Sequence, residues 1–240
     1  MAAPKYTFDA SLAGFNISKA AYIAANPHIA RVMAAAMVFR PDPSAAPTTA
    51  ASSSSSSSSP PQALLICRAA TDTYPLKWEV PGGSVDGTDA TILDGVAREL
   101  WEESGLRAAH MAAPILMSPE NDADDDPSGG GGLTESVRAG LGIQPEDEAL
   151  GLGADGLTVT FVETGNLWAK LTVLATVRGG GGADEVRLTP EEHGEAAWVT
   201  EEEVRRAELP PREGETGRRR MDFVSDGVRR SILDGFRVYE

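Results

Sequence analysis

Residues 98–106 read Arg-Glu-Leu-Trp-Glu-Glu-Ser-Gly-Leu, and the fold predicted for the whole chain depends on this stretch. It ends a strongly patterned helix expected over residues 91–104, with Thr91 as N-cap and Asp94 as its capping-box partner. Gly105 fits the left-handed position at which such helices commonly end. Apolar side chains recur every three or four residues and predict the face that packs on the core: Leu93, Val96, Ala97 and Leu100.

Three carboxylates project from a neighbouring face within one turn of this helix: Glu99, Glu102 and Glu103. Carboxylates placed so closely repel one another and destabilise a helix. A hard divalent cation such as Mg²⁺ prefers oxygen ligands, and its binding would turn this destabilisation into a net stabilisation. Arg98 is expected to hold one carboxylate by a fork-like ion pair, and Gly95 to leave room for metal and phosphate. The alternative interpretation is an ordinary charged surface on an amphipathic helix.

A glycine turn, Gly82-Gly83, ends the extended segment 78–83 and precedes the helix by one polar loop. Together with residues 98–106 it closely resembles the Nudix box, a glycine turn followed by Arg-Glu-apolar-x-Glu-Glu-x-Gly-apolar. The second half matches at every defined position. In the first half, Asp89 occupies the usual glutamate position, and eight rather than seven residues then precede Arg98. The loop is therefore one residue longer than in the family's pattern, and the role of Asp89 stays open.

The resemblance also covers the strand expected at 63–68 and a later segment at 191–199. It implies an α/β fold, the Nudix-type αβα sandwich with a mixed β-sheet between helices, formed by a single domain over residues 1–240. It further implies a Mg²⁺-dependent hydrolase, with Mn²⁺ as the alternative ion, that cleaves a diphosphate linkage in a nucleoside diphosphate derivative by water attack on phosphorus. The metal ligands it implies are Gly83, Glu99, Glu102 and Glu103.

In this interpretation Arg98 orients a carboxylate, and the ion lowers the pKa of the attacking water. Glu103, which the helix holds in place, is the first candidate for the proton acceptor, and Glu192 is the second. The substrate is left open among oxidised nucleoside triphosphates, ADP-ribose-like compounds and dinucleoside polyphosphates. Two other functions compete: a non-catalytic ligand-binding or regulatory module, which is expected to lose the box carboxylates, and an isomerase of the same fold.

Composition limits the partners. A net charge of −15 and a pI near 4.6 argue against long nucleic acids, whose non-specific binding needs clustered Lys and Arg. Cys67 is the only cysteine and is expected to be a small buried residue, with no disulfide. The longest apolar stretch, 29–39, is too short to span a bilayer, and residues 1–18 lack a signal peptide's apolar core. These features predict an intracellular, soluble, cytoplasmic protein without a membrane partner; its oligomeric state is open, a homodimer included.

Three segments are predicted to be disordered insertions: 41–62, with eight consecutive serines, 119–156, with an acidic run at 120–126, and 209–220. The acidic run is interpreted as a solvated linker rather than a metal site. Trp78 and Trp168 are expected to pack in the core, and His193 to be structural or exposed. Helices are predicted at 20–26, 201–207 and 221–236, strands at 32–40, 63–68, 110–117, 158–163, 168–177 and 196–199, and a hairpin turn at 164–166.

Overall fold

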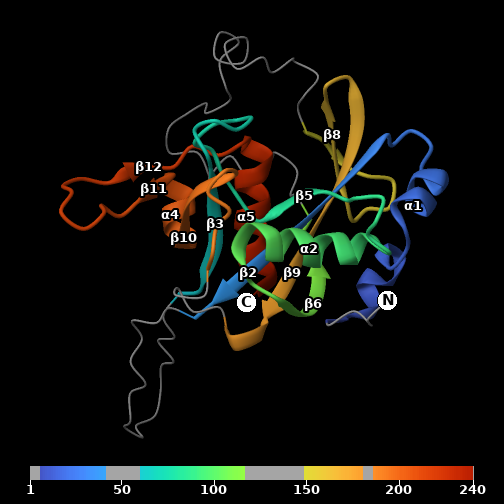
Figure 1. Ribbon diagram of the computed structural model, residues 1–240, viewed down its shortest axis with the longest axis horizontal. Helices are drawn as coiled ribbons and strands as arrows, with labels where there is room; N and C mark the ends of the chain where they lie inside the picture. The colour runs from blue at the N-terminus through green and yellow to red at the C-terminus, as the bar shows by residue number, and fades with distance from the viewer. Residues whose placement is uncertain (1–5, 42–59, 117–148, 181–185, 240) are drawn as a thin grey trace, which may run out of the picture.

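A mixed sheet of ten strands forms the centre of the computed structural model, which describes residues 6–41, 60–116, 149–180 and 186–239. The main path of this sheet is β1-β6-β9-β2-β3-β10, and four further strands pair alongside it (Figure 1). The strands are β1 (Thr7–Phe8), β2 (Arg31–Arg40), β3 (Gln62–Arg68), β4 (Trp78–Glu79), β5 (Gly82–Ser84), β6 (Ala108–Pro114), β7 (Ala149–Leu152), β8 (Val159–Glu163), β9 (Asn166–Val177) and β10 (His193–Thr200). The helices are η1 (Ala10–Phe15), α1 (Lys19–Ala25), α2 (Ile92–Ser104), η3 (Arg178–Gly180), α4 (Glu201–Arg206) and α5 (Asp226–Tyr239).

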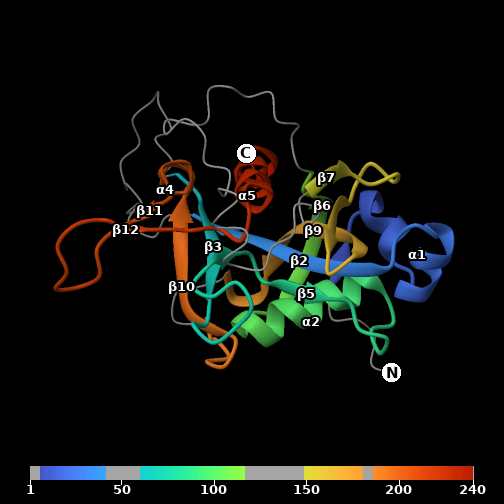
Figure 2. The same ribbon diagram turned by 90° about the horizontal axis from the view of Figure 1, so that it is seen from above.

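Strand β2 lies between two hydrophobic cores, because alternate side chains of a strand point to opposite faces. Ala34, Ala36 and Val38 join the core that also contains Leu93, Val96 and Leu100 of α2. Ala35, Met37 and Phe39 join the other core, with Ile232, Leu233 and Phe236 of α5. Helices α2 and α5 accordingly cover opposite faces of the sheet (Figure 2). The expected α/β fold, a mixed sheet between helices, is confirmed.

The sheet forks along β2, and the glycine turn lies at the fork. One part of β2 pairs with β5, while only its last two residues, Phe39 and Arg40, pair with β3. Strand β4 remains paired with β3, so residues 79–82 cross from one branch to the other. A Cβ on Gly82 would lie 2.5 Å from the Cβ of Ala35, which is closer than two carbon atoms can approach. Glycine at this position therefore allows β5 to lie against β2.

Most of the predicted elements are confirmed with small shifts at their ends. Thr91 and Asp94 form the capping box of α2, and Gly105 adopts a φ of 71° at its C-terminus. The hairpin between β8 and β9 turns through Thr164 and Gly165, with φ values of 50° and 72°. Trp78 and Cys67 are buried, as expected. Trp168 is half-buried and stacks on Phe161.

The last helix differs from its prediction, because it begins at Asp226 rather than at residue 221. Met221 is buried as expected, but its N–H donates to Ala207 and the carbonyl of Asp222 accepts from Trp78. These backbone groups are thus bonded to neighbouring segments instead of a helical turn. Tertiary contacts have overridden the helical periodicity of residues 221–225.

Two of the predicted insertions contain regular structure. The segment 209–220 is bounded by a small hairpin, β11 (Glu208–Leu209) with β12 (Arg219–Arg220). The arginines of its basic cluster are ion-paired: Arg218 with Glu208, Arg219 with Glu195 and Arg220 with Asp222. Strand β7 falls within 119–156, whereas the acidic run and the serine tract lie outside the described residues. Within the parts that the structure describes, no helix is long and apolar enough to cross a membrane.

Candidate metal and catalytic site

Two carboxylates of α2, Glu99 and Glu103, lie one turn apart and are directed at the glycine turn. Both are buried, with 8% and 7% of their surface exposed. The N–H of Gly82 donates to Glu103 Oε2 at 2.6 Å. A Cβ on Gly83 would lie 2.8 Å from each carboxylate oxygen of Glu99, so only glycine leaves these oxygens their space. The turn and the helix together therefore present two buried carboxylates to one small volume.

Both carboxyls hold their protons unusually tightly. Burial raises the pKa of Glu99 to about 7, against the lowering effect of Arg98. Burial raises the pKa of Glu103 to about 9, and the neighbouring carboxylate of Glu79 adds to the rise. Ionising both groups thus places two insufficiently balanced negative charges in a poorly solvated region. A divalent cation is the kind of ligand that would balance them.

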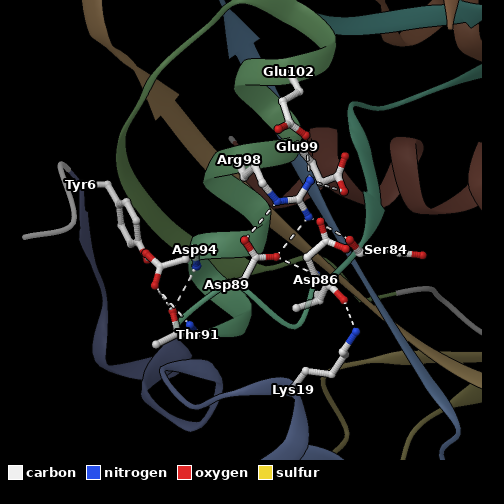
Figure 3. Close-up of polar contacts among 11 residues, drawn as sticks. Tyr6, Lys19, Ser84, Asp86, Asp89, Thr91, Asp94, Arg98, Glu99 and Glu102 are labelled. Atoms are coloured by element: carbon white, nitrogen blue, oxygen red, sulfur yellow. Dashed lines mark hydrogen bonds and ion pairs between the residues drawn. The ribbon is translucent and has the colours of Figure 1, made fainter. Parts of the chain in front are cut away.

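Arg98 connects the helix to the loop before it (Figure 3). Its Nε and Nη2 donate to the two oxygens of Asp89, each at 3.0 Å, which is the fork-like pair expected of arginine. Its Nη1 lies 2.9 Å from Glu99 Oε1 and 2.7 Å from Glu102 Oε2. The fork was expected on a helix carboxylate, but it binds Asp89 of the lengthened loop. Asp89 also accepts from the N–H of Asp86, so its observed role is to anchor the loop to α2.

The remaining predicted residues have different surroundings from those of Glu99 and Glu103. The side chain of Glu102 is 45% exposed and bound to Arg98 Nη1, the same nitrogen that contacts Glu99. Glu192 is exposed but offers an oxygen close to Glu103. Gly95 differs from its expected role: a Cβ there would meet Asp89 Oδ2 and a methyl group of Val85, both at 3.2 Å. Its missing side chain makes room for the loop, not for metal or phosphate.

Two residues near Glu103 had no place in the predicted site. Glu79 is buried, with 5% of its surface exposed, and its Oε1 lies 2.5 Å from Arg68 Nη1. One charged residue between apolar Trp78 and Val80 was the only sequence signal for it. His193 is buried rather than exposed, and its Nε2 lies 3.7 Å from Glu103 Oε1. Burial lowers the pKa of His193 to about 4, so the ring is neutral at pH 7.

A pocket of about 980 Å³ opens at the C-terminal end of α2, on its outer side. Glu102 and Glu192 contribute to its wall, together with the exposed ring of Trp101. Three arginines also line it: Arg107, Arg178 and Arg187. In a chain of net charge −15, this is a local excess of positive charge beside the carboxylate-bearing helix. Such a surface favours small anionic ligands.

The glycine turn, the anchored loop and the carboxylate-bearing helix lie together in a stretch of the chain that is similar to a known domain, the NUDIX domain. The family model of that domain matches residues 57–136. The match covers 80 of the 240 residues, a third of the chain.

Solved structures of low sequence identity also match. A MutT NUDIX hydrolase from Burkholderia pseudomallei is 16% identical, over 85% of this chain and 96% of that chain, with a TM-score of 0.44. The NUDIX domain of Shewanella oneidensis NrtR, complexed with ADP ribose, is 12% identical over 93% and 99%, with a TM-score of 0.45. An Ap4A hydrolase from C. elegans is 16% identical over 87% and 96%, with a TM-score of 0.42. No significant match to a curated protein was found.

Substituting Gly83 by alanine is expected to weaken Mg²⁺ binding by at least about tenfold, the scale of disturbing a metal ligand's support. The added Cβ would come within 2.8 Å of both oxygens of Glu99 and displace them. Isothermal titration of the metal-free protein with Mg²⁺ measures the effect. Gly87→Ala is the matched control, because a Cβ at Gly87 meets nothing within 4 Å. Equal affinities of the two variants would contradict this placement of Glu99.

The affinity for Mg²⁺ is expected to rise with pH between about 6 and about 9, by up to roughly tenfold per pH unit for each proton released. Burial holds the pKa of Glu99 at about 7 and that of Glu103 at about 9, and an ion must displace both protons. Over the same range the metal-free protein loses stability as pH rises, because the folded state binds protons that the unfolded chain has released. Titrations at several pH values test this, and a flat profile would contradict it.

Proposed function

We propose that the protein is a metal-dependent hydrolase that cleaves a diphosphate linkage in a nucleoside diphosphate derivative, by attack of water on phosphorus. The single observation that carries the proposal is the burial of Glu99 and Glu103 together at the glycine turn. Glu99 shares the positive charge of Arg98 with Asp89 and Glu102, and among the described residues no arginine or lysine is ion-paired with Glu103. Two ionised carboxylates at this position destabilise the metal-free protein, and the binding of a cation would explain why the site contains them.

Glu99 and Glu103, with the carbonyl of Gly83, would hold Mg²⁺ or Mn²⁺, and Glu102 would join them from the edge of the site. The bound ion would neutralise diphosphate oxygens and make a water molecule more acidic. Arg98 positions Glu99 and Glu102 by direct contact. For the proton acceptor we propose Glu103, whose orientation is fixed by the N–H of Gly82, with Glu192 as the alternative.

The substrate proposed is a small nucleotide-like diphosphate. The pocket beside α2 supports this class, because its arginines suit phosphate oxygens and the exposed ring of Trp101 suits a nucleobase. Long nucleic acids are not proposed as partners. The arginines of the cluster 218–220 are paired with carboxylates, which leaves little charge to displace counterions. The oligomeric state, a homodimer included, is open to measurement.

The test is hydrolysis of a pooled panel of nucleoside diphosphate derivatives by the purified protein, with Mg²⁺ and after chelation. Mass spectrometry in ¹⁸O water would identify the products and show which phosphorus the water attacks. Cleavage that requires the ion supports the proposal. Binding of panel compounds without turnover would favour a non-catalytic module instead. An altered organic product without phosphate release would favour an isomerase.

A further inference from the structure

His193 is a buried side chain whose two ring nitrogens have no hydrogen-bond partner among the described residues. The residue is 2% exposed, at the first position of β10. Its Nε2 lies 3.7 Å from Glu103 Oε1, which is too far for a hydrogen bond. Burying polar atoms without partners destabilises a fold. The position of this ring therefore needs a further partner to explain it.

Three potential ligand atoms meet at this point. Glu103, Glu192 and His193 each offer one, and the three atoms lie within 4.8 Å of one another. Atoms that bind one ion at about 2.1 Å are at most about 4.2 Å apart, so closure by less than about 1 Å suffices. Small rotations of side chains would achieve this without moving the backbone.

The backbone that carries these ligands is well anchored. The N–H groups of Glu192 and His193 both donate to the carbonyl of Thr189, and the carbonyl of Glu192 accepts from Ala69. Thr189 in turn donates its hydroxyl to the carbonyl of Glu102 on α2. The turn before β10 is thus tied to the same helix that carries Glu103. The three side chains converge because two separate segments are bonded together there.

Arg68, the described arginine whose charge acts on His193, does not fill this role. It is bound to Asp72 at 2.7 Å and to Glu79 at 2.5 Å. The positive charge of Arg68 is thereby balanced by these two carboxylates. The carboxylates of Glu103 and Glu192 together with a neutral nitrogen are a donor set for a metal ion rather than for a further arginine or lysine.

We propose that His193 is a nitrogen ligand of the divalent ion bound by Glu103, with Glu192 as a further protein ligand on the same side of the ion. This inference rests on the metal-dependent function proposed above and specifies the ion. Imidazole favours first-row transition metals, whereas Mg²⁺ prefers oxygen ligands alone. The site therefore prefers Mn²⁺ or Co²⁺ to Mg²⁺, and His193 is the residue that sets the preference.

Pulsed electron paramagnetic resonance of the full chain loaded with Mn²⁺ tests the ligand directly. The wild type is expected to show hyperfine coupling between Mn²⁺ and a ¹⁴N nucleus. His193→Gln is expected to lose that coupling and to bind Mn²⁺ about tenfold more weakly, with a smaller change for Mg²⁺. His110→Gln is the matched control, since His110 lies on β6, where its Nδ1 contacts Thr7 and its Nε2 lies 3.3 Å from Asp9. It is expected to retain both the coupling and the affinity.

Glu192→Gln provides a second variant if His193→Gln fails to fold, because Glu192 is exposed. It is expected to weaken Mn²⁺ binding while keeping the nitrogen coupling. Bound Mn²⁺ without nitrogen coupling in the wild type, or coupling that survives in His193→Gln, would overturn the proposal. Unchanged Mn²⁺ affinity in Glu192→Gln would overturn the set of three ligands. Hydrolysis of the panel with Mg²⁺ is measured separately. A result that excludes His193 as a ligand therefore leaves the test of the proposed hydrolase function unaffected.

Discussion

Replacing Glu103 by glutamine is expected to lower kcat on the order of a thousandfold, the scale of removing a proton acceptor. It removes a proposed metal ligand at the same time. Glutamine has the shape of the protonated carboxyl that the metal-free site favours, since burial raises the pKa of Glu103 to about 9. The variant is therefore expected to be at least as stable as the wild type without metal. Mg²⁺, however, should no longer raise its Tm.

Two measurements separate loss of function from loss of fold in this variant: initial rates on the best substrate of the panel, and thermal unfolding with and without Mg²⁺. Glu202→Gln is the matched control. Glu202 is an exposed residue of α4 paired with Arg206, and its replacement is expected to leave both quantities unchanged. Activity of Glu103→Gln within tenfold of the wild type would remove Glu103 from the mechanism.

Arg98→Ala is expected to produce the largest loss of stability, about 3 kcal/mol in the free energy of unfolding. This is the low end of the range for breaking a buried ion pair by removing one partner. The low end applies because the side chain of Arg98 is itself 23% exposed. Without Arg98, the buried carboxylate of Asp89, 6% exposed, and that of Glu99 lose the ion-pair partner that they have among the described residues. Urea denaturation at pH 7 measures the loss.

Two further variants, Arg98→Lys and Arg206→Ala, provide comparisons for the stability of Arg98→Ala. Arg98→Lys keeps the charge but not the two-pronged contact with Asp89, so an intermediate loss is expected. Arg206→Ala breaks an exposed pair with Glu202 and is expected to cost less than about 1 kcal/mol. If Arg98→Ala were no more destabilised than Arg206→Ala, the loop 84–91 would not depend on its anchor to α2.

The carboxylate-bearing helix was predictable nearly to the residue. Its N-cap, its capping box and its left-handed Gly105 depend on contacts between residues at most four positions apart, which a sequence displays directly. The hairpin between β8 and β9 was predictable for the same reason. The start of α5 was not, because residues 221–225 are held by bonds to Trp78 and Ala207, far away in the chain.

Helical spacing alone placed Glu99, Glu102 and Glu103 together, without ranking them. The tertiary structure decides which of them are buried, because packing of Leu93, Val96 and Leu100 into the core sets the rotation of α2 about its axis. That rotation turns two of the carboxylates toward the glycine turn and leaves the third at the surface with Arg98.

The sequence by itself thus determined the class of fold and the helix that bears the site, because both rest on local patterns of apolar residues, caps and glycines. Only the tertiary structure decided what surrounds Glu103. Pairing of β3 with β4 brings Glu79 beside it, and pairing of β3 with β10 brings His193. These contacts join residues about 25 and 90 positions from the helix end. Strand register is set by burial over the whole sheet, so no local pattern could have specified them.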